Sequence, residues 1–218
     1  MNRTWATGVS ALIFPIGVVC LSMVAGCQPA ATEGLEALVN RKGDDARSGL
    51  QAIDVKEFQL LGRGAEQGDR DAENNLGVLY EEGRGAPADI SQAIYWYRKA
   101  ARQGLATAQT NLGRLYAQGR GVPKDYAVAK SWFQKAAEQG DADAMGNLGR
   151  VYGEGDGVRP DAVEGLKWLI LSGKQYQLGL LQEPLYNVKN REGLMSRMMS
   201  SEVADAHQRA NEWFAARE

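Results

Sequence analysis

The sequence has very few of the residues that most often bind metals or act as nucleophiles. Its 218 residues include only two cysteines, Cys20 and Cys27. Because both precede residue 28, the rest of the chain has neither a disulfide framework nor a thiolate metal site. His207 is the only histidine, which argues against a metal site of several histidines and against a Ser-His-Asp triad. We therefore predict no metal, no cofactor and no catalytic residues.

The sequence also lacks an excess of charge of either sign, and it has no run of β-branched residues after residue 25. Its formal net charge is −2, whereas a protein that binds nucleic acid needs a basic face. We therefore predict no nucleic-acid partner. Ala, Gly, Leu, Gln and Glu are plentiful, which favours helices, and a hydrophobic content of 44% is typical of a folded protein.

The first 27 residues have the composition of a secretory signal. Arg3 is followed by a stretch without charge, residues 4–26, whose length would also allow a membrane-spanning helix. The stretch ends in Val24-Ala25-Gly26-Cys27, which resembles the lipobox of bacterial lipoproteins. That resemblance implies removal of residues 1–26 as a signal peptide and attachment of lipid to Cys27. The alternatives are an uncleaved anchor helix and an ordinary signal peptide with a chance cysteine.

The residues after this motif would connect a lipid anchor to the folded part of the protein. Gln28 follows the cysteine, and in the sorting pattern that this resembles an Asp there favours the inner membrane. We therefore expect the periplasmic face of the outer membrane. Residues 27–50 are interpreted as the lipidated cysteine and a flexible tether. Asp54-x-x-Glu57 has the form of a capping box, so residues 51–69 are predicted to contain an N-terminal capping helix.

A motif of the form Leu-Gly-x-x-Tyr-x-x-Gly-x-Gly occurs three times, beginning at Leu76, Leu112 and Leu148. The interval is 36 residues each time, and the Asn before each Leu recurs with it. A period of this size indicates a solenoid of repeated helical units. We assign to the repeated frame Leu76, Gly77, Tyr80, Trp96, Leu112, Gly113, Tyr116, Trp132, Leu148, Gly149, Tyr152 and Trp168.

Each repeat is predicted to fold as two antiparallel helices. In the first repeat, Asp69 is the expected N-cap and apolar residues follow at helical spacing. Gly83 ends this helix, and Asp89 begins a second helix that ends at Gly104. We expect the Leu, Tyr and Trp of the frame to fill the space between the two helices. Replacing Trp132 by Ala would then cost about 3–5 kcal/mol.

The 36-residue period, together with the Gly-x-Gly loop and the Pro that follows it, resembles the Sel1-like repeat family, which is related to the tetratricopeptide repeat. The resemblance implies an all-α fold, a short right-handed α-solenoid of antiparallel helix pairs. The repeats would be residues 70–104, 105–140 and 141–176, followed by C-terminal capping helices in residues 177–218.

The third unit departs from this pattern. Gly165 stands where the other units have Ala, and the glycine that closes the second helix is missing. The register is lost after Leu171. We expect a helix from about Tyr186 to Met198 and then a final helix capped by Ser200 or Ser201.

If the tetratricopeptide geometry carries over, the first helix of each repeat lines a concave groove. The residues on that face differ between the repeats while the frame stays constant, which is typical of a binding surface; the alternative is an ordinary solvated face. The predicted partner-binding residues are Asp71, Asn74, Val78, Glu81, Glu82, Thr107, Thr110, Arg114, Gln118, Asp143, Arg150 and Glu154, with Ala117, Gly146 and Gly153 on the same face.

Three features that resemble chemical sites have simpler structural interpretations. Gly83-Arg84-Gly85 has no strand before it and no Gly-Lys-Ser/Thr after it, so it is interpreted as a helix end and not as a phosphate loop. His207 is expected at the surface. The pair Glu81-Glu82 has the residue types of a glycoside hydrolase but no evident apolar pocket to raise the pKa of one carboxyl.

These observations predict a protein that is not an enzyme. We expect a membrane-anchored periplasmic scaffold or adaptor that binds another protein or peptide through the concave face of the repeats. One alternative is an immunity protein that neutralises a periplasmic toxin. A second is a cell-wall hydrolase, since some related repeat proteins are associated with β-lactam binding, but those relatives have paired cysteines in each repeat and this chain has none.

Overall fold

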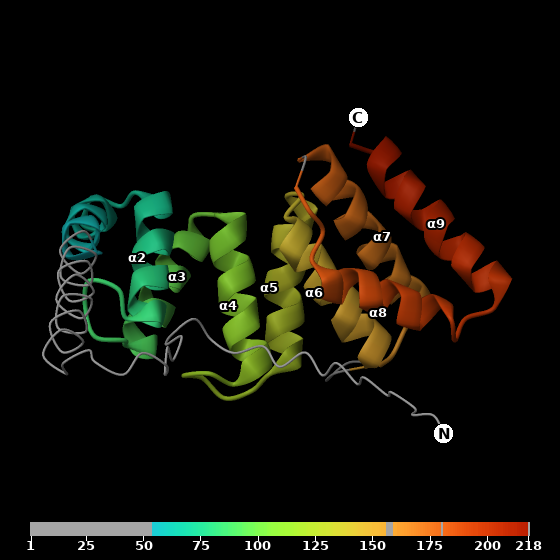
Figure 1. The fold of residues 1–218 in the computed structure, drawn as a ribbon, viewed down its shortest axis with the longest axis horizontal. Helices are drawn as coiled ribbons and strands as arrows, with labels where there is room; N and C mark the ends of the chain where they lie inside the picture. The colour runs from blue at the N-terminus through green and yellow to red at the C-terminus, as the bar shows by residue number, and fades with distance from the viewer. Residues whose placement is uncertain (1–53, 156–158, 180, 218) are drawn as a thin grey trace, which may run out of the picture. The chain divides into compact units, whose positions relative to one another are not determined.

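The computed structural model describes residues 54–155, 159–179 and 181–217, and every regular element within these ranges is an α-helix (Figure 1). The predicted signal peptide, the lipidated Cys27 and the tether lie outside the described residues. None of the helices in the described ranges is long and apolar enough to cross a membrane. The prediction of an all-α repeat fold is confirmed.

The helices follow one another as packed pairs. Residues 54–66 are helical and precede the first complete pair. The helices after them are α2 (Arg70–Glu82), α3 (Ile90–Arg102), α4 (Ala106–Gln118), α5 (Tyr126–Glu138), α6 (Ala142–Glu154), α7 (Ala162–Leu178), α8 (Leu185–Met195) and α9 (Ser200–Ala215). Helix α2 packs on α3, α4 on α5 and α6 on α7, and each pair contacts the next, while α8 and α9 both pack on α7 (Figure 1).

Local signals explain where the helices of the repeats begin and end. The side chain of Asp69 accepts hydrogen bonds from the backbone N–H groups of Asp71 and Ala72 at 2.9 and 3.2 Å, which caps α2. Helix α2 ends at Gly83, whose φ of 72° is left-handed and therefore suits glycine. The equivalent residues 36 and 72 positions later end α4 and α6 in the same conformation. These predicted boundaries are confirmed.

The residue that fills the space between the two helices of a repeat is not the Trp of the frame but the residue after it. Tyr97 is 1% exposed and Phe133 is 0% exposed, whereas Trp96 and Trp132 are only partly buried. The frame glycine explains this choice, because a Cβ on Gly77 would lie 2.7 Å from the ring of Tyr97. The prediction that Trp96 and Trp132 fill the space between the two helices is therefore wrong.

The two partly exposed tryptophans instead form the apolar surface beneath lysine side chains. The Nζ atom of Lys99 lies 4.6 Å from the ring centroid of Trp96, and that of Lys135 lies 4.6 Å from the ring centroid of Trp132. Trp168 is buried, and Trp213 of α9 packs against it with the ring centroids 6.2 Å apart. The Nζ atom of Lys167 lies 4.4 Å from the ring centroid of Trp168, so a lysine covers this sequence position in all three units and a capping helix is added in the third.

The third repeat ends differently from the other two, as its sequence suggests. Gly104 and Gly140 follow the ends of α3 and α5 with left-handed φ values of 86° and 91°. The equivalent residue of the third repeat is Tyr176. Helix α7 therefore runs on to Leu178. The N-cap of α9 is Met199 and not Ser200 or Ser201; the Met199 N–H donates to Glu202 Oε2 at 2.8 Å. The Glu202 carboxylate thus does the capping that the sequence predicts for a serine.

Candidate functional site

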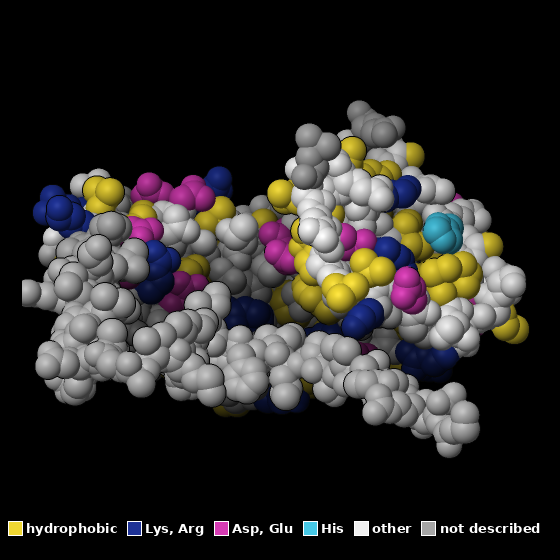
Figure 2. Space-filling model, in the orientation of Figure 1, with side chains coloured by type: hydrophobic (Ala, Val, Ile, Leu, Met, Phe, Trp, Pro, Cys, Tyr) yellow, Lys and Arg dark blue, Asp and Glu magenta, His cyan; other side chains and the backbone are white. Residues whose placement is uncertain are grey.

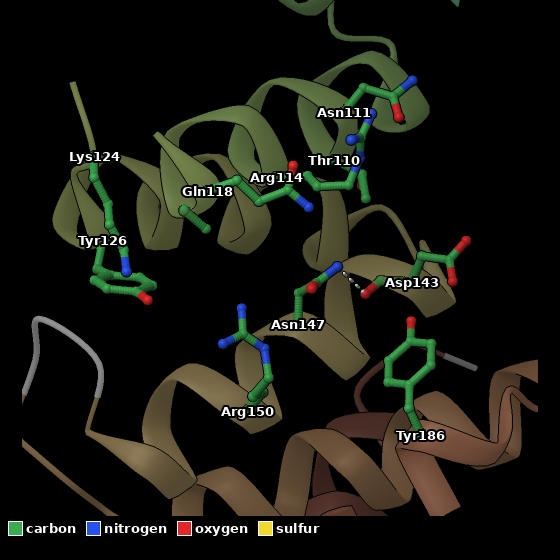
Figure 3. A pocket seen from close by; sticks show the side chains of 11 residues that line it. Thr110, Asn111, Arg114, Gln118, Lys124, Tyr126, Asp143, Asn147, Arg150 and Tyr186 are labelled. Atoms are coloured by element: carbon green, nitrogen blue, oxygen red, sulfur yellow. Dashed lines mark hydrogen bonds between the residues drawn. The ribbon is translucent and has the colours of Figure 1, made fainter. Parts of the chain in front are cut away.

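A pocket of about 750 Å³ opens between α4, α6 and α8 (Figure 3). Helix α4 contributes one wall, the loop after it and the start of α5 contribute a second, and α6 with the first turn of α8 contributes the rest. The lining residues are Thr110, Asn111, Arg114, Ala117, Gln118, Lys124, Tyr126, Asp143, Asn147, Arg150 and Tyr186.

The pocket brings together the predicted binding residues of the second and third repeats. They are Thr110, Arg114, Ala117 and Gln118 from α4 and Asp143 and Arg150 from α6. The other residues predicted to bind a partner lie outside the pocket: Asp71, Asn74, Val78, Glu81, Glu82, Thr107, Gly146, Gly153 and Glu154. The candidate site is therefore shorter than the groove predicted from the sequence.

Five lining residues were not predicted. Asn111 and Asn147 recur at the same interval as the frame, and both line the pocket. A constant polar residue beside an apolar motif is the signal that could have identified them. The side chain of Asn147 donates to the backbone carbonyl of Asp143 at 2.9 Å (Figure 3). Lys124, Tyr126 and Tyr186 come from segments outside the first helices, where counting along the repeat gives no information.

The carboxylate of Glu81 links two repeats and is therefore not available to a partner protein. Its Oε2 accepts from Arg114 Nη2 at 2.7 Å and from the Tyr97 hydroxyl at 2.9 Å, and its Oε1 accepts from Arg120 Nη1 at 2.6 Å. Burial by itself raises the pKa of Glu81, but the hydrogen bonds and positive charges of these partners outweigh it, so the pKa is lowered. The carboxylate therefore stays ionised and joins α2 to α4 and to the loop after α4.

We expect Glu81→Gln to lower the free energy of unfolding by about 1 kcal/mol at neutral pH. Because the folded-state pKa lies below the ordinary value of 4.5, the stabilising contribution of the carboxylate is complete above that value and is lost as pH falls through the folded pKa. The difference in unfolding free energy between wild type and variant should therefore shrink below pH 4.5. Urea unfolding followed by circular dichroism at several pH values measures it.

The matched control is Glu82→Gln, which changes the adjacent and exposed carboxylate. Among the described residues, Glu82 forms an ion pair only with Arg84, at 3.5 Å and at the surface, and such pairs contribute little. This variant should unfold like wild type at every pH. A difference for Glu81→Gln that stays constant down to about pH 3 would show that its ionised form is not what stabilises the fold.

Helix α8 covers the face of α6 where the sequence predicted an open groove. A Cβ on Gly146 would lie 2.5 Å from the amide of Asn187, and a Cβ on Gly153 would lie 2.8 Å from Leu194. The two glycines thus give α8 the room to pack on α6. Asn187 is fully buried there and donates to the Ser172 hydroxyl at 3.0 Å. The groove therefore ends at the first turn of α8.

Two acidic side chains near the pocket have partners within the protein. The Tyr176 hydroxyl donates to Asp143 Oδ1, and the Thr110 hydroxyl donates to Asp141 Oδ1 at 3.0 Å. Burial raises the pKa of Asp141 despite this bond and the one from the Ala144 N–H. Asp141 is the N-cap of α6, so it holds α6 beside α4 and does not face a ligand.

The remaining features that resembled chemical sites have structural roles in the described residues. The Arg84 guanidinium binds Asp54 and Glu57 at 3.0 Å each, so the Gly83-Arg84-Gly85 loop ties α2 to the preceding helix. His207 is exposed on α9 and visible at the surface in Figure 2. No group of three or more His, Cys, Asp or Glu residues in the described ranges could hold a metal ion.

Comparisons with known proteins agree with this architecture. The model of the Sel1 repeat matches residues 70–105, 106–141 and 142–177. The crystal structure of a Sel1 repeat protein from Oxalobacter formigenes is 34% identical, with a TM-score of 0.54, and the match covers 63% of this chain and 98% of that one.

A second solved structure is a protective antigen present in uropathogenic Escherichia coli strains, described as having the SLR fold. It is 28% identical, with a TM-score of 0.47, and the match covers 72% of this chain and 40% of that one. Among curated proteins, none matches the chain. With three matched repeats and a structural relative that it covers almost completely, the chain belongs to the Sel1 repeat family, whose members generally serve as non-catalytic scaffolds for protein–protein interactions.

Proposed function

We propose that this protein is a scaffold or adaptor of the bacterial cell envelope that binds a segment of another protein in the pocket between α4, α6 and α8. The observation that carries the proposal is the composition of the pocket. Most of its walls come from repeat positions that differ between units, such as Thr110, Arg114 and Gln118, and the constant asparagines of α4 and α6 complete them, while the constant apolar residues pack the helices together. A solenoid holds such a variable face on a rigid frame, which suits recognition.

The envelope location is supported by the sequence of the first 27 residues. Val24-Ala25-Gly26-Cys27 resembles a lipobox, and lipid on Cys27 would hold the repeats at the membrane. A single acyl chain binds a bilayer only marginally, whereas two or more hold a protein stably. Gln28 favours the outer membrane. The protein would then act on the periplasmic side and bring its partner to that surface.

The pocket assignment is tested by blocking the pocket with a large side chain. Gln118 is exposed at the end of α4 and lines the pocket, so Gln118→Trp should fill part of it without disturbing the core. Proteins that are cross-linked to the wild-type chain in cells and recovered from solubilised membranes should be at least about tenfold depleted with this variant, a loss of about 1.4 kcal/mol in affinity. Quantitative mass spectrometry of the recovered proteins measures the depletion.

Gln134→Trp is the matched control, because Gln134 is also an exposed glutamine but lies on α5 outside the pocket. It should recover the same proteins as wild type. If Gln118→Trp recovers them as well, the pocket is not the binding site. The same cells test the anchor: the chain should sediment with membranes, and Cys27→Ser should leave an uncleaved precursor. Normal processing of that variant would contradict the lipoprotein assignment.

A further inference from the structure

Three leucine side chains project into solvent where the chain passes from α7 to α8. Leu178, the last residue of α7, is 69% exposed, and Leu181 is 67% exposed. Leu185, the first residue of α8, is 65% exposed. We call these three residues the leucine turn. Single exposed leucines are ordinary at a protein surface, whereas several in one short segment form an apolar patch of the kind that contacts a partner.

Backbone hydrogen bonds determine the conformation of the leucine turn. The Leu181 N–H donates to the Tyr176 carbonyl at 2.9 Å. The Gly179 N–H donates to the Gln175 carbonyl at 3.0 Å, so two of the last carbonyls of α7 have partners. Pro184 then precedes α8, and its ring restricts its own φ. The exposure of the leucines therefore follows from the way in which α7 ends and α8 begins.

The leucine turn lies in a part of the sequence with little charge. Residues 175–182, which include two of the three leucines, carry no charged side chain. The acid that follows them, Glu183, accepts hydrogen bonds of 2.7 and 3.1 Å from Arg191, and both side chains are largely buried. Lys174, which precedes them, donates to Asn211 at 2.7 Å. The turn can therefore enter an apolar phase without taking an unpaired charge out of water.

The leucine turn projects from the protein and does not line a hollow. None of its residues lines the pocket between α4, α6 and α8 or the cavity of about 110 Å³ between α6 and α8. Figure 2 shows other hydrophobic side chains gathered at the surface over α8. A protein partner needs a surface of complementary shape around its central anchors, whereas the fluid interface of a bilayer adapts to a projecting apolar group. These features favour a lipid surface as the partner of the leucine turn.

We infer that the leucine turn enters the surface of the membrane to which the chain is anchored, as a second contact besides the lipid on Cys27. The inference rests on the membrane anchor of the proposed function. Residues 28–53 connect Cys27 to the first described helix, and a segment of 26 residues spans at most roughly 90 Å. The anchor therefore keeps the turn close to a bilayer, where a second contact has a high effective concentration. Two contacts fix how the repeats face the membrane, which a tether alone does not.

The inference is tested on the mature lipidated chain in vesicles of phosphatidylethanolamine and phosphatidylglycerol. Cys20 and Cys27 are the only cysteines. Because the first is removed with the signal peptide and the second carries lipid, Leu181→Cys supplies the only free thiol. An environment-sensitive fluorophore on this thiol should shift its emission to shorter wavelength in vesicles. Lipid with a nitroxide on its acyl chain should quench it at least about threefold, because insertion places it at the boundary of headgroups and acyl chains.

Leu60→Cys is the matched control, because Leu60 is 70% exposed but lies on the helix of residues 54–66. A fluorophore at this position should keep its emission in water and should not be quenched. A second variant replaces Leu178 and Leu185 by Gln in the Leu181→Cys chain. Its quenching should fall at least about threefold, because most of the apolar surface that enters the bilayer is lost. These leucines are exposed, so their replacement leaves the core intact.

Four outcomes would overturn the inference. Equal quenching at Leu60→Cys and Leu181→Cys would show that the anchor alone brings the protein surface to the bilayer. A shift in emission that grows with protein density but is not quenched by nitroxide lipid would show that a second copy covers the leucines. An unchanged emission in vesicles would leave the anchor in place and the turn in water. If the wild-type chain reacts with the fluorophore, Cys27 is free, and both the anchor and the inference are wrong. The pocket is tested separately, by Gln118→Trp.

Discussion

Phe133→Ala should lower the free energy of unfolding by about 3–5 kcal/mol, a large share of the stability of a small domain. The ring is fully buried between α5 and α4 and fills the space that Gly113 leaves open; a Cβ on that glycine would lie 2.7 Å from it. Removal of the ring leaves a cavity in the middle repeat, which packs on units at both ends. Urea unfolding of the purified chain, followed by circular dichroism at 222 nm as is usual for helices, measures about this loss.

The neighbouring residue supplies the control. Trp132→Ala removes a larger side chain, but one that is partly exposed and covered by Lys135. We expect this variant to lower the free energy of unfolding by less than about 2 kcal/mol. Less buried apolar surface is lost than with Phe133→Ala, and the space left by the ring is open to water. If Trp132→Ala proves more damaging than Phe133→Ala, the assignment of the core position is wrong and the frame Trp is the central residue after all.

Gly165→Ala should destabilise the protein by about 1–3 kcal/mol, although it restores the alanine found at the equivalent positions of the first two repeats. A Cβ at Gly165 would lie 2.9 Å from the backbone N of Gly153 and 3.0 Å from the backbone O of Gly149. Backbone atoms of α6 cannot rotate away as a side chain can. Helices α6 and α7 would have to separate, and the gain in helix propensity, about 1 kcal/mol, is too small to offset this.

Gly193→Ala tests the effect of helix propensity alone, without a change in packing. Gly193 is in α8, and no heavy atom lies within 4 Å of where its Cβ would be. This variant should be as stable as wild type or up to about 1 kcal/mol more stable. Opposite signs for the two Gly→Ala variants would separate a glycine needed for close packing from one that is merely tolerated. If both variants are more stable than wild type, α6 and α7 leave room for a Cβ at Gly165, and the predicted clash is wrong.

The repeat architecture could be predicted because its signals are local. An Asp before each second helix and a glycine after each first helix fix the boundaries by their own backbone chemistry, and the 36-residue interval repeats them. The choice between two adjacent aromatics could not be predicted in this way. Whether Trp96 or Tyr97 enters the core depends on how the two helices are rotated about their axes, which the conserved spacing of Trp does not reveal.

The candidate site was likewise predictable only where local sequence signals determine it. Counting along the first helices found Thr110, Arg114 and Arg150, because a helical face repeats with the sequence. Tyr186 could not be found by counting, since it reaches the pocket only when α8 folds back onto α6. The glycines of α6 were visible in the sequence as gaps in the predicted binding face. In the structure these glycines lie where α8 packs on α6. The sequence alone does not show that a helix packs there.

The missing glycine at the end of the third repeat also limits how such an array can lengthen. Residues 106–141 begin and end like their neighbours, so a tandem duplication of this segment would insert a complete unit that both flanking units can accept. A duplication of residues 142–177 would instead place the extended α7 in the interior, where Tyr176 would take the position at which every internal unit turns. By this geometry, the array can lengthen by copying a unit that ends in glycine, and not by copying its third unit.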